Sequence, residues 1–188
     1  MLIELKPMRK SDFSVVVNWV NSYDQDFLYQ WAGNTYTYPL TEDQMENHYS
    51  RGINSIDSSV YIYKIIQTET QEVMGTVQLG RFDIINKEAV VGRFLIKADQ
   101  DRGKGIGTKA LEELVRIGFE EFSLHRMKLY VFHINTQAIR CYEKVGFVSE
   151  NITKNIYQSI SGDYWDGIEM FIDKETWQQD KPVEFKVE

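Results

Sequence analysis

The stretch RGKGIGTKALEELVRIGF, residues 102–119, decides the fold. It opens with three glycines within six residues, and glycine adopts backbone conformations that a side chain disfavours. From Ile106 onward, apolar residues such as Ala110 and Leu114 recur at a helical spacing of about 3.6 residues. A glycine-rich turn that leads into a helix presents free backbone N–H groups, which favour a phosphate or another anion. The stretch therefore predicts an anion site at the start of a helix.

The segments on either side of this turn define its context. Runs rich in Val, Ile and Tyr predict three strands before it, at residues 60–66, 73–79 and 89–96, which form an antiparallel meander. After it, the pattern predicts a strand at 127–132, a helix at 135–144 that ends at Gly146, and strands near 147–157 and 165–172. The fold class is α+β: one mixed, mostly antiparallel sheet of about six to seven strands, with helices on both faces.

The N-terminal part is predicted to form a strand at residues 3–7 and then a helical region in two parts. The two parts are separated at Gly33-Asn34 and Tyr38-Pro39, because glycine and proline interrupt helices. Asp12 is expected to cap the first helix, and Thr41 with Gln44 reads as a capping box for the second. We expect one domain over residues 1–177 and a polar tail at 178–188.

Composition narrows the class of protein. The chain has 188 residues, one cysteine (Cys141), three histidines and a net charge of −7. A single cysteine excludes an internal disulfide, and the histidines lack ligand spacing, so no metal is expected. The negative charge argues against nucleic acid as a partner. No apolar run is long enough for a membrane span and no secretory signal is apparent, so we expect a cytoplasmic protein without a membrane partner.

Two nucleotide-binding motifs could explain a glycine-rich turn. A phosphate loop of the Walker type needs Gly-x-x-x-x-Gly-Lys-Ser/Thr, which the sequence lacks. A dinucleotide fingerprint needs a parallel strand-helix-strand unit, whereas this turn follows a meander. A nucleotide-binding regulator is therefore not favoured.

The order of strand, Arg102-x-x-Gly105-x-Gly107, helix, strand, Asn135 and the helix that ends in YEKVGF at 142–147 closely resembles the GNAT superfamily of acetyl-CoA-dependent N-acetyltransferases. The resemblance covers about residues 60–173. The segments 164–167 and 175–177 further resemble the branch that includes the ribosomal-protein acetyltransferases RimJ and RimL.

The resemblance implies acetyl-CoA as cosubstrate. The turn would hold the pyrophosphate of coenzyme A, the strand before it would pair with the pantetheine arm, and Asn135 would contact the cofactor. The two central parallel strands, at 89–96 and 127–132, would splay apart to form the cleft. The expected cofactor-binding residues are Phe94, Leu95, Ile96, Arg102, Gly103, Lys104, Gly105, Ile106, Gly107, Thr108, Asn135 and Tyr142.

The resemblance also suggests catalytic groups. Tyr142 matches the family tyrosine that protonates the departing thiolate of coenzyme A, although a core aromatic residue is the structural alternative. Some relatives carry a glutamate as general base where this chain has Tyr130, between Leu129 and Val131. Glu88 is a substitute base acting through water, against the alternative of an exposed hairpin glutamate.

We therefore expect an enzyme that transfers an acetyl group to a primary amine. The acceptor is either a protein N-terminus or a small molecule of polyamine or aminoglycoside type, which the sequence does not distinguish. The alternative from another class is a non-catalytic acyl-CoA sensor or interaction module. Oligomeric state is open, with a homodimer as the candidate.

Overall fold

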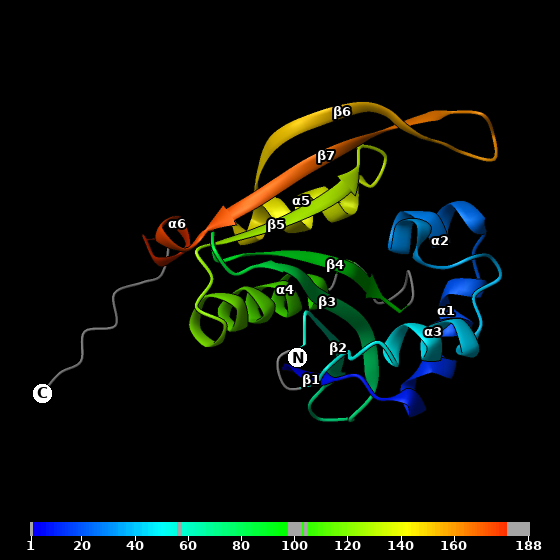
Figure 1. The fold of residues 1–188 in the computed structure, drawn as a ribbon, viewed down its shortest axis with the longest axis horizontal. Coiled ribbons are helices and arrows are strands. Elements are labelled where there is room, and N and C mark those ends of the chain that lie inside the picture. Colours follow the sequence, from blue (N-terminus) through cyan, green and yellow to red (C-terminus); the bar gives the residue numbers. More distant parts are fainter. Residues whose placement is uncertain (1, 56–57, 98–102, 104, 180–188) are drawn as a thin grey trace, which may run out of the picture.

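A single seven-stranded sheet organises the chain in the computed structural model, which describes residues 2–55, 58–97, 103 and 105–179 (Figure 1). The strand order is β1-β2-β3-β4-β5-β7-β6, and every neighbouring pair is antiparallel except β4 and β5. The strands are β1 (Ile3–Pro7), β2 (Val60–Gln67), β3 (Val73–Asp83), β4 (Glu88–Ile96), β5 (Arg126–Phe132), β6 (Val148–Gln158) and β7 (Tyr164–Asp173). The predicted mixed, mostly antiparallel sheet is confirmed.

Helices cover both faces of the sheet, as predicted. One face packs on α4 (Ile106–Arg116) and α5 (Thr136–Val145) through a core that includes Val77, Leu79, Leu111 and Met127. The opposite face, over the β2–β4 side, packs on α1 (Phe13–Asn21), α2 (Gln25–Ala32) and α3 (Glu42–Tyr49). Side chains alternate across a strand, so Ile62 enters the second core while Tyr63 enters the first.

The N-terminal region contains three helices in place of the two predicted. The chain breaks after α1 because Asp24 starts a new helix, its carboxylate accepting the Phe27 N–H at 2.9 Å. Asp12 makes no side-chain cap for α1, so that expectation is wrong. Its carboxylate instead accepts the Arg9 N–H at 2.7 Å and pairs with Lys64 at 2.8 Å.

The start of α3 follows the prediction in part. The Thr41 hydroxyl accepts the Gln44 N–H at 3.2 Å, which is the expected cap. The Gln44 side chain does not return to the Thr41 N–H but bonds the Thr37 N–H and the Pro39 carbonyl. It thereby fixes the loop that leads into α3.

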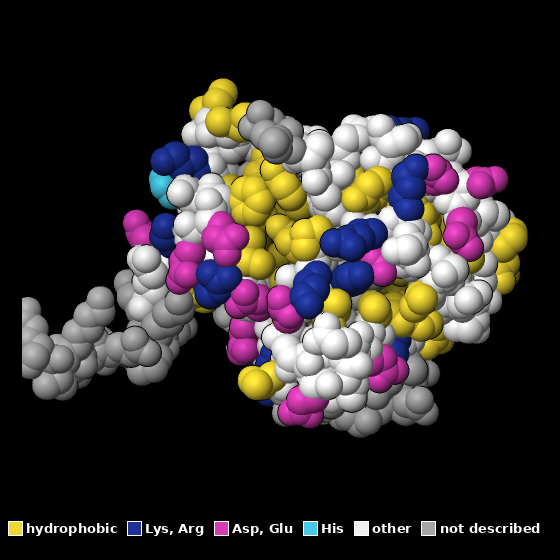
Figure 2. Space-filling model, turned by 90° about the horizontal axis from the view of Figure 1, so that it is seen from below, with side chains coloured by type: hydrophobic (Ala, Val, Ile, Leu, Met, Phe, Trp, Pro, Cys, Tyr) yellow, Lys and Arg dark blue, Asp and Glu magenta, His cyan; other side chains and the backbone are white. Residues whose placement is uncertain are grey.

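The far edge of the sheet is formed by β6, which is exposed along almost its whole length. Its pairing with β7 is irregular between Ser149 and Asn151 and between Thr153 and Tyr157. Seen from below, acidic and basic side chains intermingle on the surface (Figure 2). Among the described segments there is no helix of the length and apolarity that crossing a membrane requires.

Candidate active site

The two central strands separate partway along their length. β4 and β5 pair in parallel over four residue pairs, from Glu88 opposite Arg126 to Val91 opposite Leu129. Beyond Val91 the β5-facing edge of β4 has no strand partner within the described residues. Along residues 92–95 this edge can pair with an extended ligand through backbone N–H and C=O groups. This is the splay that the family resemblance implied.

A β-bulge lies where the strands part. Thr76 of β3 pairs with Leu95, and Gln78 pairs with Gly92, so β4 carries one extra residue between them. Within it Arg93 has φ of 44°, an uncommon conformation for a side-chain-bearing residue. The Thr76 hydroxyl donates to the Arg93 carbonyl at 3.1 Å and holds the bulge. Neither Thr76 nor Arg93 is among the site residues predicted from the sequence, because a bulge has no periodic signature.

The glycine turn leads into α4 as predicted. Gly103 and Gly105 have φ of 75° and 80°, and a β-carbon would be strained at either position. Gly105 is the N-cap of α4, and no side chain of the described residues caps the helix there. The first-turn N–H groups, including those of Gly107 and Thr108, therefore lack intrahelical partners and can bind an anion.

Two other predicted turn residues, Arg102 and Lys104, lie outside the described residues. Their proposed contribution of charge to the anion site stays a prediction.

Gly107 also lets α4 lie close to its neighbours. A β-carbon there would come within 3.3 Å of the Phe94 ring and 3.5 Å of Cys141 Sγ. Phe94 and Ile96 pack toward α4, whereas Leu95 is buried under the N-terminal helices. Phe94, Leu95 and Ile96, the predicted cofactor residues of β4, therefore pack on both faces of the sheet. The edge of β4 that has no strand partner borders the splay.

Tyr142 lies on α5, with its ring between Phe94 and Phe147, 6.1 Å from each. The side chain is buried, and burial raises the pKa of the phenol well above its ordinary value. Within the described segments its hydroxyl has no hydrogen-bond partner. A buried, protonated phenol with a free donor beside the free edge of β4 suits a proton donor. Burial also raises the pKa of the neighbouring Cys141 thiol. Unlike the Tyr142 hydroxyl, this thiol has a hydrogen-bond partner, Thr108 Oγ1, at 3.6 Å.

Asn135 begins α5 and reaches the N-terminal helices. Its side-chain oxygen accepts the Ala138 N–H at 3.3 Å, which is a helix cap, and its Nδ2 donates to Gln30 of α2 at 3.4 Å. The structure thus gives Asn135 a role in joining α5 to α2. Its predicted contact with the cofactor stays a prediction.

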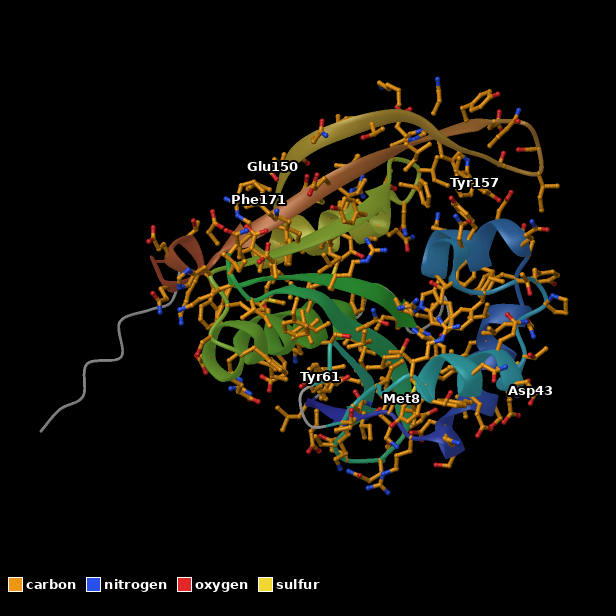
Figure 3. All side chains as sticks on the ribbon, viewed as in Figure 1. Met8, Asp43, Tyr61, Glu150, Tyr157 and Phe171 are labelled. Carbon is orange, nitrogen blue, oxygen red and sulfur yellow. The ribbon has the colours of Figure 1, made fainter. Side chains whose placement is uncertain are left out.

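Helix α2 is tied to the β6–β7 hairpin on the other side of the splay (Figures 1 and 3). The Tyr157 hydroxyl donates to Asp26 at 2.7 Å, and the Tyr157 ring stacks on Tyr29 at 3.9 Å. Phe132 and Trp165 extend this aromatic cluster. α2 therefore roofs the opening between β4 and β5.

The candidate base Glu88 lies at the closed end of the parallel pair. Its carboxylate pairs with Lys128 at 2.7 Å. At about 3.3 Å per residue, it is roughly 13 Å along the strand from Gly92, where the splay begins. Tyr130, which replaces the glutamate of some relatives, is exposed and donates to Glu169 at 3.1 Å. The described residues contain no group of three or more potential metal ligands.

Comparison with known proteins supplies the family. The model of the acetyltransferase (GNAT) domain matches residues 3–148. Among curated proteins, a probable N-acetyltransferase, YjcK of Bacillus subtilis, is 37% identical over 50% of this chain and 51% of its own. An aminoglycoside N(6')-acetyltransferase type 1 of Klebsiella pneumoniae is 26% identical over 77% of this chain and 73% of its own. The chain thus spans about half of the first of these relatives.

A solved structure shares the fold. The spermidine N-acetyltransferase of Vibrio cholerae, in complex with CoA and spermine, superposes with a TM-score of 0.79 at 23% identity. The match covers 94% of this chain and 98% of that one. At this level of identity the likeness shows the fold alone.

Proposed function

The chain belongs to the GNAT acetyltransferase family, and from this premise we propose that it transfers the acetyl group of acetyl-CoA to the primary amine of a small molecule. The observation that carries the proposal is the buried Tyr142 beside the free edge of β4, at the end of a splay that the α4 N-terminus also faces. The relatives named for aminoglycoside and spermidine acetylation favour a small amine over a protein N-terminus. The narrower resemblance to the RimJ and RimL branch stays a prediction.

The residues present fit the cosubstrate. The left-handed glycines at 103 and 105 have no β-carbon of their own that would obstruct a pyrophosphate at the first turn of α4. The free edge of β4 offers N–H and C=O groups to an amide-bearing arm. Acetyl-CoA supplies the activated acetyl thioester in this arrangement.

Two steps of the transfer, polarisation of the carbonyl and protonation of the sulfur, then have a group to assist them. A backbone N–H of the bulged segment of β4 polarises the thioester carbonyl, as oxyanion-binding N–H groups do. Tyr142 donates its proton to the departing sulfur as the amine nitrogen bonds to the acyl carbon. The amine proton passes to solvent, because the described part of the splay holds no carboxylate like the glutamate that some relatives have on β5.

The same tyrosine argues against the alternative, a non-catalytic acyl-CoA sensor. Such a module needs the α4 turn and the free strand edge but has no use for an unbonded phenol in a buried position. We therefore favour the enzyme.

A thiol-release assay tests the proposal. Purified protein would be mixed with acetyl-CoA and a panel of polyamines, aminoglycosides, amino acids and N-terminal peptides. We expect turnover with at least one small amine and a thermal shift with CoA alone. Turnover with N-terminal peptides only would contradict the proposed acceptor class, and a CoA shift without any turnover would favour the sensor.

A further inference from the structure

The side chain of Arg93 occupies the face of the sheet that the N-terminal helices cover. It leaves the bulge toward α2 and the 3-10 turn at Gly33–Thr35. Its Nη1 donates to Gln78 Oε1, its Nη2 donates to Thr35 Oγ1 at 2.6 Å, and its guanidinium carbon lies 5.6 Å from the centre of the Tyr36 ring. All three contacts are to groups without a negative charge.

Among the residues that the structure describes, the guanidinium has no carboxylate partner. No ion pair of Arg93 occurs in the described part of the chain. Burial lowers the pKa of its guanidinium, an effect that Tyr36 opposes and that Arg81 adds to. Its Nε–H is buried and has no hydrogen-bond partner among those same residues. Buried charges in proteins are ordinarily paired, so an unpaired one needs an explanation.

The position of Arg93 supplies one. Its backbone lies in the bulge where β4 leaves β5, which is where the acyl carbonyl would be held. Phe94 on one side of the bulge faces Tyr142, whereas the Arg93 side chain faces the roof helix α2. The proton donor and the guanidinium therefore flank the splay from opposite faces of the sheet. The Nη2 end reaches exposed Thr35, so this end is open to a ligand.

We propose that Arg93, with the Thr35 hydroxyl, binds a carboxylate of the acceptor, which would be a primary amine carrying a carboxylate a short carbon chain away. The inference rests on the proposed function and narrows its acceptor. A guanidinium edge and an adjacent hydroxyl offer two donors to the two oxygens of a carboxylate. The second ammonium of a polyamine would be repelled at the same place.

Matched acceptors test the site. The ratio of kcat/KM for 4-aminobutyrate to that for butylamine and for 1,4-diaminobutane would be measured by thiol release, with glycine and 3-aminopropionate as shorter homologues. We expect the wild-type protein to favour a carboxylate-bearing amine by about tenfold or more, as a site built for a polar group rejects a ligand that lacks it. Arg93→Gln should bring the ratio to about one, and Arg93→Lys should keep part of it.

Two further variants serve as a control for charge and as a second test of the site. Arg81→Gln removes a cation of the same charge from an exposed position on β3 and should leave the ratio within about twofold of wild type. Thr35→Val alters an exposed residue, so it tests the site even where Arg93→Gln fails to fold; it should lower the ratio several-fold. An unchanged ratio in both Arg93→Gln and Thr35→Val would overturn the proposal, as would a wild-type preference for amines without a carboxylate.

Binding separates this site from the proposed function. Calorimetry would measure the affinity of 4-aminobutyrate for the CoA-loaded protein, wild type and Arg93→Gln. Arg93-dependent binding without acetylation of any amine would overturn the proposed function and support the anion site. Acetylation of plain amines without a carboxylate preference would overturn the anion site and support the proposed function. The absence of both overturns both.

Discussion

The two ends of the β4–β5 pair differ in whether their polar side chains have hydrogen-bond or ion-pair partners. At the closed end, charged side chains lie near solvent and find partners, as in the pairs of Glu88 with Lys128 and Arg126 with Asp173, both at 2.7 Å. At the open end, the side chain of Tyr142 is buried, and the Arg93 Nε–H is buried without a hydrogen-bond partner among the described residues. Unsatisfied polar groups are costly to bury, so the Arg93 Nε–H distinguishes the open end, which is where we propose that the chemistry takes place.

Removing the phenol at the open end should have the largest effect. Tyr142→Phe deletes the proton donor while keeping the ring that packs on Phe94 and Phe147. We expect kcat to fall by about 100-fold, since a positioned general acid contributes on the order of 10²–10⁴. The affinity for CoA, measured by calorimetry, should change little.

Tyr130→Phe is the matched control, because it removes the hydroxyl of an exposed tyrosine on β5. Its kcat should stay within about twofold of wild type. Equal losses in the two variants would remove Tyr142 from the mechanism.

Straining the glycine turn should have the next largest effect. Gly105→Ala places a side chain at φ of 80°, where nothing lies within 4 Å, so the cost is backbone strain alone. Strain of roughly 1–2 kcal/mol should weaken CoA binding by about tenfold as the turn shifts. Gly162→Ala places a similar strain at φ of 93° in the turn between β6 and β7, where nothing lies within 4 Å either, and it should bind CoA nearly as wild type does. An equal defect in the two variants would show that the turn at Gly105 is not the anion site.

The buried polar groups of the open end should also make stability depend on pH. The Tyr36 hydroxyl bonds His48 Nδ1 at 2.7 Å, and burial lowers the pKa of His48 to about 4, with Arg93 contributing. The unfolded chain then takes up the proton first as pH falls. Stability is complete above the ordinary pKa of 6.5 and declines toward pH 4.

Allowing for solvent screening, we expect a loss of about 1 kcal/mol at pH 5 relative to pH 7.5. Thermal unfolding between pH 4 and 7.5 would show it. His48→Gln should unfold with a shallower dependence on pH in this window, and parallel curves for the two proteins would exclude His48 as the cause.

The closed end should give the smallest effect. Glu88→Gln breaks the pair with Lys128, and a single pair near the surface contributes about 0–1 kcal/mol. Since Glu88 lies far along the strand from the splay, we expect kcat to change by less than about twofold. A large fall in kcat, with a shifted acidic limb of its pH profile, would instead identify Glu88 as the base acting through water.

The sequence predicted those parts of the fold that repeat or that need a special residue. The alternation of β2–β4, the helical period of α4 and the left-handed glycines at 105 and 146 were all visible in it. The break between α1 and α2 was missed because apolar residues continue across it and only Asp24 marks the new helix. Asp12 was predicted to cap the first helix, because its actual ion pair with Lys64, 52 residues away, has no sequence signature.

The candidate site was predictable only where a motif carried it. The anion-binding turn follows from the glycine spacing, and Tyr142 follows from the resemblance to the GNAT superfamily. Arg93 and Thr76 were missed, because a β-bulge depends on register between two strands. The roof contacts of Asp26 with Tyr157 were also missed, since they join segments 131 residues apart.

The outer strand β6 has a consequence for behaviour at high concentration. An exposed strand of eleven residues at the margin of a sheet is a template on which further chains could add, as in fibrous aggregates. Here Lys154 and the positive φ of Asn155 fall within the second pairing irregularity, which bends and charges that margin. Replacing Lys154 and Asn155 with β-branched apolar residues would remove both features and favour such addition of further chains.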